Sequence, residues 1–138
     1  MKSKKISLYI DGASRGNPGP SGIGVVILGE DDKKLKEVYK YIGNTTNNIA
    51  EYNALVYGLD EALMLRADEV ILNLDSELVV KQLNGEYKVR DANIRLFFDK
   101  ALHILKSFKH FEINHIDRSL NKEADRLANK AINLAGLV

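Results

Sequence analysis

The sequence predicts an α/β domain built on a five-stranded mixed sheet with helices on both faces. Two observations indicate this class. Residues 5–42 alternate between apolar and polar side chains around a glycine-rich turn that holds the only two prolines, Pro18 and Pro20, as in neighbouring antiparallel strands. Beyond them, apolar residues recur at spacings of three and four, as in amphipathic helices, with two short β-rich runs in between.

Three segments near the N-terminus are predicted to be strands, at residues 5–11, 22–29 and 34–42. In the first of them Ile6, Leu8 and Ile10 point to one face and the polar residues to the other. Residues 12–21 (GASRGNPGPS) have the composition of a turn, and residues 30–33 form a second, polar turn. Strands joined by such tight turns form an antiparallel meander.

The rest of the chain alternates helices with the two remaining strands. Helices are predicted at residues 47–66, 76–84, 92–108 and 120–135, and strands at residues 69–75 and 111–116. Ser76 is a plausible N-cap of the second helix, and Gly85 stops it. The first, fourth and fifth strands are expected to run parallel, because helices connect them through right-handed crossovers.

Composition excludes several classes of function. The 138 residues contain no cysteine, which rules out disulfides, thiolate metal sites and a cysteine nucleophile. Hydrophobic residues make up 45% and charged residues 28%, close to the average of globular domains. The net charge of +1 gives no strong attraction to nucleic acid or membrane. Without an apolar run of about 18 residues or a signal peptide, we expect no membrane partner and a cytoplasmic location.

Four acidic residues do not fit an ordinary solvated surface. Asp11 and Asp75 end apolar strands, where each could simply cap a turn or a helix. Glu51 shares the apolar stripe of its helix, and Asp125 lies on the face continued by Ala128. An acid at the edge of such a stripe that reaches solvent is the simpler interpretation. The functional one is a buried carboxylate that is paired, protonated or bound to a cation.

These four acids are expected to converge at one end of the sheet. Ligand sites of open α/β sheets lie beyond the carboxyl ends of parallel strands. Four carboxylates in one place cannot all stay ionised unaided, and a pair of Mg²⁺ ions would relieve their repulsion. Two such ions about 4 Å apart suit in-line displacement at phosphorus.

Four segments, in order, resemble the type 1 class of the ribonuclease H family: DGASRGNPGPSGIGVVI, TTNNIAEYNALVYGL, LDSELVVKQL and RSLNKEADRLAN. The resemblance runs from residue 5 to about residue 134 and implies a ribonuclease H-like fold, with residues 1–138 as a single catalytic domain. It further implies hydrolysis of the RNA strand of RNA–DNA hybrids, with 3′-hydroxyl and 5′-phosphate ends. The implied cofactor is Mg²⁺ or Mn²⁺, with two ions in each active site.

The family's metal ligands correspond to Asp11, Glu51, Asp75 and Asp125. Positions similar to its substrate contacts are Gly12, Ala13, Ser14, Arg15, Gly16, Asn17, Asn47, Asn48 and Ser76. Backbone groups of the glycine-rich turn could approach the 2′-hydroxyls of RNA closely. Ordinary turn and cap chemistry remains an alternative for the three asparagines and for Ser76.

The sequence departs from the best-known bacterial pattern before its last helix. The family's mobile catalytic histidine would correspond to His115, which instead has the alternation of a strand residue. Arg118 lies in the predicted loop and is the preferred residue to help the phosphate leave, in an electrostatic role because arginine does not release its proton.

A second departure concerns the grip on the substrate. The segment GEYKVRDAN is short and holds few basic residues, Lys88, Arg90 and Arg95, which with Lys81 form either a small basic patch or scattered solvated charges. We therefore expect hybrid binding that is weak and salt-sensitive.

Rival interpretations remain open at this point. The same fold could serve a nuclease for double-stranded RNA or a junction resolvase, since fold alone does not settle function. A non-catalytic nucleic-acid-binding module, or a structural domain whose acids form caps and salt bridges, belongs to a different class. A monomer is expected.

Overall fold

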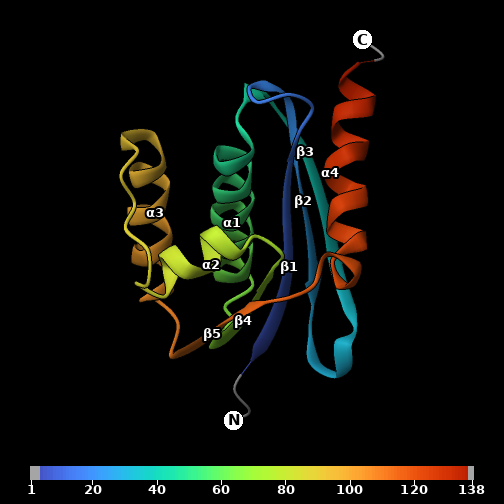
Figure 1. Cartoon of the computed structure of the whole chain (residues 1–138). Helices are drawn as coiled ribbons and strands as arrows, with labels where there is room; N and C mark the ends of the chain where they lie inside the picture. Colours follow the sequence, from blue (N-terminus) through green and yellow to red (C-terminus); the bar gives the residue numbers. More distant parts are fainter. Residues whose placement is uncertain (1–3, 137–138) are drawn as a thin grey trace.

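The computed structural model describes residues 4–136 as one mixed sheet with helices packed on it (Figure 1). The strands are β1 (Lys5–Ser14), β2 (Gly19–Leu28), β3 (Lys34–Thr45), β4 (Glu69–Leu74) and β5 (His110–His115). The helices are α1 (Asn47–Met64), α2 (Glu77–Leu83), α3 (Ala92–Leu105) and α4 (Lys122–Ala135). Short 3-10 turns, η1 (Glu30–Asp32) and η2 (Arg118–Leu120), complete the order.

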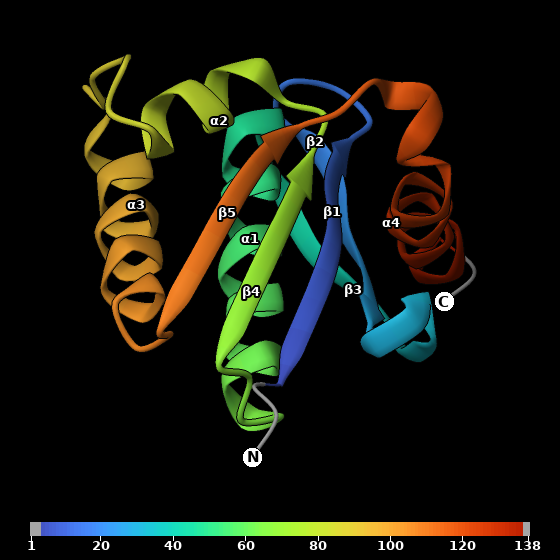
Figure 2. The ribbon, with the colours of Figure 1, turned by 90° about the horizontal axis from the view of Figure 1, so that it is seen from below.

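The strand order across the five-stranded sheet is β3-β2-β1-β4-β5. β1 pairs antiparallel with β2, and β2 with β3, whereas β1 with β4 and β4 with β5 pair in parallel. Viewed from below, the three parallel strands lie side by side with their carboxyl ends together (Figure 2). The predicted meander and the predicted parallel trio are both confirmed.

The two faces of the sheet bind different helices. Ile6, Leu8 and Ile10 of β1 are fully buried on the face covered by α1, and α3 packs against the outer side of α1. On the opposite face α4 crosses the antiparallel half of the sheet (Figure 2). The prediction of helices on both faces is therefore confirmed.

Two glycines of β2 allow α4 to lie directly on the sheet. A Cβ atom at Gly24 would stand 2.1 Å from the carbonyl oxygen of Ala124 and 2.8 Å from the amide nitrogen of Ala128. At Gly22 it would stand 2.5 Å from the carbonyl oxygen of Ala128. Because backbone atoms cannot yield as a flexible side chain can, these positions require glycine.

Gly24→Ala is expected to lower the free energy of unfolding by about 3 kcal/mol, since α4 must move away from β2 to admit the methyl group. The matched control is Gly58→Ala on α1, where the new Cβ would make ordinary contacts at 3.4 Å with Ile10, Leu8 and Val25. Urea unfolding monitored by circular dichroism measures both variants. Equal costs at the two positions would show that the close contact with α4 does not limit packing.

The structure corrects several predicted boundaries. Gly12–Ser14 and Gly19–Ser21 were expected in a turn, but they belong to strands, because the β1–β2 ladder continues to the pair Ser14↔Ser21. Only residues 15–18 form the turn. Asp11 therefore lies within β1 and not at its end. The predicted strand 69–75 ends one residue earlier, at Leu74, so Asp75 directly follows β4.

Two helix boundaries also differ. The predicted helix 92–108 ends at Leu105, because the chain turns over residues 106–109 before it enters β5. The predicted helix 120–135 begins at Lys122, after η2, where the side chain of Asp117 accepts a hydrogen bond from the amide of Ser119. Among residues 4–136 no helix combines the length and the apolar character that crossing a membrane requires.

Candidate active site

Three of the four singled-out acids meet at the carboxyl end of the parallel strands. Asp11 lies in β1, Glu51 in α1 and Asp75 directly after β4, and one carboxylate oxygen from each lies within 4.8 Å of the others. Asp11 and Glu51 are buried, and Asp75 is half-buried. The convergence expected from the strand order therefore takes place for these three residues.

A glycine brings Glu51 to this place. A Cβ atom at Gly12 would lie 2.2 Å from the carbonyl carbon of Ala50, so α1 touches β1 here backbone to backbone. The amide nitrogen of Gly12 donates a 2.9 Å hydrogen bond to Oε1 of Glu51. The other oxygen, Oε2, is buried without a hydrogen-bond partner. One oxygen is thus oriented by the backbone, and the other is left for a ligand.

Burial makes these carboxylates hard to ionise together. It raises the pKa of Asp11 to about 11, and the contact with Glu51 and the charge of Asp75 act in the same direction. Burial likewise raises the pKa of Glu51 to about 7, against the lowering effects of Asp11, the Gly12 amide and the charge of Arg118. At neutral pH the protein alone keeps a proton on this pair. A cation in the cluster would take the place of that proton.

Asp125 approaches the cluster from α4, and its contact with Asp11 contributes to the raised pKa of Asp11. Its expected position on the apolar face of α4 is wrong, because Asp125 is exposed. The buried stripe of the helix passes through Ala124 and Ala128, and Asp125 lies beside it. Nδ2 of Asn129 donates to Oδ1 of Asp125 at 3.3 Å and to its carbonyl oxygen at 3.0 Å.

Asn121 joins the site although the sequence did not single it out. Its Nδ2 donates to Oδ2 of Asp75 at 2.9 Å and to the carbonyl oxygen of Ile10 at 2.8 Å. An asparagine directly before a helix is typical of an N-cap, which hid this contact. Asn121 does occupy the cap position of α4, but its side chain makes no capping hydrogen bond.

His115 and Arg118 lie close together in the sequence, at the end of β5 and in the segment that connects β5 to α4. His115 is the last residue of β5, as its alternation indicated, and its Nε2 lies 3.3 Å from the carbonyl oxygen of Asp75. Arg118 opens η2, and its positive charge helps to lower the pKa of Glu51. Both residues are therefore near the cluster, and their roles remain predictions.

The predicted substrate contacts form a connected surface beside the acids. Oδ1 of Asn47 accepts a hydrogen bond from the amide of Ser14 at 3.1 Å, and Oδ1 of Asn17 accepts one from the amide of Asn47 at 3.2 Å. These bonds connect the end of β1 and the turn after it to the start of α1. They leave the side-chain nitrogens (Nδ2) of Asn17 and Asn47 for other partners. Asn48 is exposed next to them, and Gly16 has a positive φ of 120°.

Three other predicted contacts are placed differently. Arg15 reaches across to α4, where its guanidinium lies 3.3 Å from Oδ1 of Asn129. Ser76 caps α2, because its Oγ accepts a hydrogen bond from the amide of Val79 at 3.3 Å. Ala13 is half-buried within β1.

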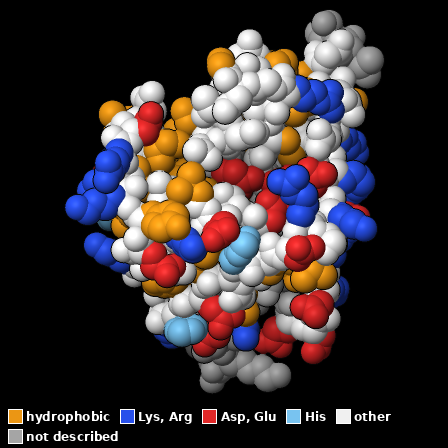
Figure 3. Space-filling view, in the orientation of Figure 1, with side chains coloured by type: hydrophobic (Ala, Val, Ile, Leu, Met, Phe, Trp, Pro, Cys, Tyr) orange, Lys and Arg blue, Asp and Glu red, His pale blue; other side chains and the backbone are white. Residues whose placement is uncertain are grey.

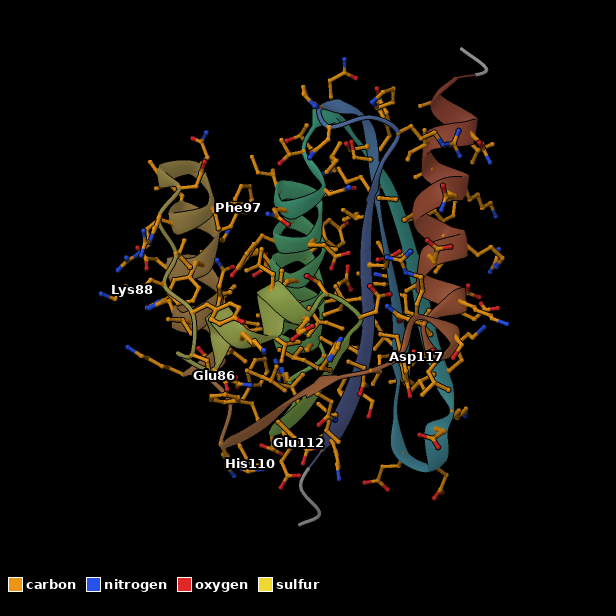
Figure 4. All side chains as sticks on the ribbon, viewed as in Figure 1. Glu86, Lys88, Phe97, His110, Glu112 and Asp117 are labelled. Atoms are coloured by element: carbon orange, nitrogen blue, oxygen red, sulfur yellow. The ribbon has the colours of Figure 1, made fainter. Side chains whose placement is uncertain are left out.

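The predicted basic patch is partly neutralised within the protein. Lys81 forms a 2.8 Å ion pair with Glu77, and Arg95 forms a 3.0 Å ion pair with Asp99. Lys88 lies in the loop that joins α2 to α3 and points away from the body of the protein (Figure 4). On the face shown in Figure 3, acidic side chains gather in the middle and basic ones lie towards both sides. An anionic polymer would thus meet cations on both flanks of the acids.

The donor set suits a hard divalent cation. The cluster offers only carboxylate oxygens, which Mg²⁺ and Mn²⁺ prefer, and a positive charge there would relieve the repulsion by which Glu51 and Asp75 help to raise the pKa of Asp11. The unpartnered Oε2 of Glu51 is a buried acceptor that such an ion would satisfy.

The strand order, the helices on both faces of the sheet and the acids at the carboxyl ends of the parallel strands define a domain of the ribonuclease H-like class. A family model described as "Reverse transcriptase-like" matches residues 9–131. The RNase H1 of Halobacterium salinarum has a solved structure that is 40% identical, covers 94% of this chain and 98% of that one, and superposes with a TM-score of 0.91. The chain belongs to the ribonuclease H family.

Two further proteins are similar over most of the chain. The N-terminal RNase H domain of a bifunctional protein of Mycobacterium tuberculosis, solved as a fusion, is 40% identical, with 98% of each chain covered and a TM-score of 0.93. LC11-RNase H1, isolated from compost, was solved in complex with an RNA/DNA hybrid; it is 44% identical, with 94% and 98% of the two chains covered and a TM-score of 0.88.

Some of the curated relatives are much longer than this chain. It spans 36% of the whole mycobacterial protein and 64% of the Ribonuclease HI of Halobacterium salinarum, to which it is 40% and 41% identical.

Proposed function

We propose that this chain is an endoribonuclease that hydrolyses the RNA strand of RNA–DNA hybrids in a reaction that depends on two divalent ions. The observation that carries the proposal is the convergence of Asp11, Glu51 and Asp75 with carboxyl pKa values raised by burial. The hybrid bound to LC11-RNase H1 supports the choice of substrate. The domain assignment over residues 1–138 and a monomeric state belong to the same proposal.

Each acid has a defined place in the proposed reaction. Asp11, which approaches the three other acids, would help to hold both ions; Glu51 and Asp75 would hold one of them with it, and Asp125 the other. When bound, Mg²⁺ or Mn²⁺ supplies an activated water and neutralises the leaving oxygen. Water attacks the phosphorus in line with the 3′-oxygen and gives up a proton, the P–O3′ bond breaks, and the 3′-oxygen takes up a proton from solvent, so that the products carry 3′-hydroxyl and 5′-phosphate ends.

Recognition of RNA is assigned to the surface formed by the end of β1 and the start of α1. The amide nitrogens of Asn17 and Asn47 are fixed in place by the bonds that their oxygens accept, so they can donate to base edges in the minor groove. Backbone groups of Gly12, Ala13, Ser14, Arg15 and Gly16 line the same stretch, with Asn48 and Ser76 at its borders. The acidic cluster next to this surface supports a scissile phosphate that binds beside it.

A gel assay tests the function. One end-labelled RNA is offered paired with DNA, paired with RNA, and alone, each with Mg²⁺ and with EDTA. We expect cleavage of the hybrid only, lost with EDTA and lost in Asp75→Asn, which retains the wild-type circular dichroism spectrum. Equal cleavage of double-stranded RNA would broaden the substrate. Tight hybrid binding without cleavage would replace the enzyme by a binding module, and activity retained in Asp75→Asn would refute the site.

Arg118→Ala is expected to lower kcat on the hybrid roughly tenfold to a hundredfold with little change in KM, since a positive charge near the reacting phosphate is lost. Arg118→Lys should recover part of the rate because it retains the charge without the planar guanidinium. Steady-state kinetics of both variants, beside His115→Ala, measure this. A larger loss of kcat in His115→Ala would transfer the role to the histidine.

A further inference from the structure

Asn121 makes contacts that neither a cap nor a core residue requires. It is 1% exposed, and its single amide nitrogen bridges two acceptors, the carbonyl oxygen of Ile10 in β1 and Oδ2 of Asp75 after β4. Its Oδ1 is buried without a hydrogen-bond partner. The carbonyl oxygen of Asn121 also accepts the amide of Asp125 at 3.1 Å. The side chain of Asn121 therefore connects β1 to Asp75, and its backbone begins the first turn of α4 as any cap residue would.

The chemistry of an amide suits this position beside an acidic cluster. A second carboxylate there would add to the repulsion among the acids, and a lysine would neutralise Asp75 and compete with a cation. A neutral N–H donor fixes one oxygen of Asp75 and leaves the other oxygen, and the negative charge, for a metal ion. Hydrogen bonds of this kind orient metal-ligating carboxylates and tune their affinity.

We propose that Asn121 is the positioning residue of the metal centre: its side chain sets the orientation of Asp75 relative to Asp11. The inference rests on the proposed function, because the ion in question is the one proposed for the reaction. Asn121 does not touch substrate, and it acts on the reaction through Asp75.

The structure offers a closely matched control. Asn73 is also a buried asparagine, 7% exposed, and its Nδ2 also donates to a carbonyl oxygen of β1, that of Leu8, at 3.2 Å. Its other contact is a neutral side chain, because its Oδ1 accepts from Nδ2 of Asn114 at 3.3 Å. Asn73→Ala therefore removes the same kind of link to β1 without removing a contact to a metal ligand.

Isothermal titration with Mg²⁺, without nucleic acid, tests the proposal on the whole chain. Asn121→Ala is expected to raise the dissociation constant for Mg²⁺ roughly tenfold, and Asn73→Ala to leave it unchanged although both variants lose thermal stability. In an Asp75→Asn background, Asn121→Ala should cause no further loss of affinity, because the carboxylate through which it acts is gone.

Equal Mg²⁺ affinities of Asn121→Ala and wild type would overturn the proposal, as would the same loss of affinity with and without Asp75. If Asn121→Ala does not fold, Asn121→Ser carries the same test, since a shorter hydroxyl cannot reach both acceptors. The proposed function fails separately: it would be refuted by a wild-type protein that binds Mg²⁺ but cuts no hybrid. The titration still reports on Asn121 in that case.

Discussion

Asp11→Asn is expected to reduce cleavage of the hybrid by about a thousandfold or more while raising the melting temperature of the metal-free protein. Asp11 is the acid that every other acid of the site approaches, so no ion site remains complete without its charge. The same charge is costly in the absence of cations, because burial and neighbouring carboxylates hold the pKa of Asp11 at about 11. Activity and stability should therefore change in opposite directions.

Single-turnover cleavage assays and differential scanning calorimetry in EDTA measure the two effects. Mg²⁺ should raise the melting temperature of the wild type and have little effect on Asp11→Asn, since a ligand stabilises the state that binds it. Asp60→Asn, on the same helix as Glu51 but outside the cluster, serves as the control and should change neither quantity. A destabilised Asp11→Asn would mean that Asp11 forms a structural bond and does not belong to a cation site.

The metal-free protein is expected to lose stability as the pH rises from about 4.5 to about 7. Burial raises the pKa of Glu51 from 4.5 to about 7, so over this range the folded state binds more protons than the unfolded state. The stabilisation is complete below the unfolded-state pKa and disappears as the pH passes the folded-state value. The raised pKa of Asp11 acts in the same direction. Glu51 alone accounts for an expected loss of about 3 kcal/mol, to which Asp11 adds.

Urea titrations in EDTA at several pH values give this slope directly. Glu51→Gln should remove about half of it, because the neutral amide does not titrate whereas Asp11, whose pKa is also raised, still does. Saturating Mg²⁺ should also flatten the slope, since the ion takes the place of the proton. A free energy of unfolding that rises over this interval in the metal-free wild type would contradict the assignment of the proton to the cluster.

The sequence was sufficient for the features that depend on periodicity. The strand order follows from short turns and helical crossovers, and Glu51 could be singled out because a carboxylate interrupts the apolar stripe of its helix. The end of β1 could not be placed in the same way. Glycine and serine at residues 12–14 suggest a turn by composition, whereas their pairing with β2 is a contact between strands.

Other parts of the site depend on contacts that no local pattern reports. Asn121 meets Ile10 and Asp75 across 111 and 46 residues of sequence, and Arg15 meets Asn129 across 114. The prediction for Asp125 failed although it rested on a local pattern. Its position on the buried face was inferred from Ala128, Ile132 and Ala135. The spacing of such residues shows that α4 has a buried face, but it does not show that Asp125 lies just outside this face.

The dispersal of the site along the chain bears on how the protein is made. During synthesis on the ribosome, a chain that has emerged only through β5 would hold Asp11, Glu51 and Asp75 but neither Asn121 nor Asp125. Gly22 and Gly24 of β2 allow the last helix to pack directly against the sheet. A nascent chain is therefore expected to stay inert towards RNA–DNA hybrids until α4 docks and completes the acidic centre.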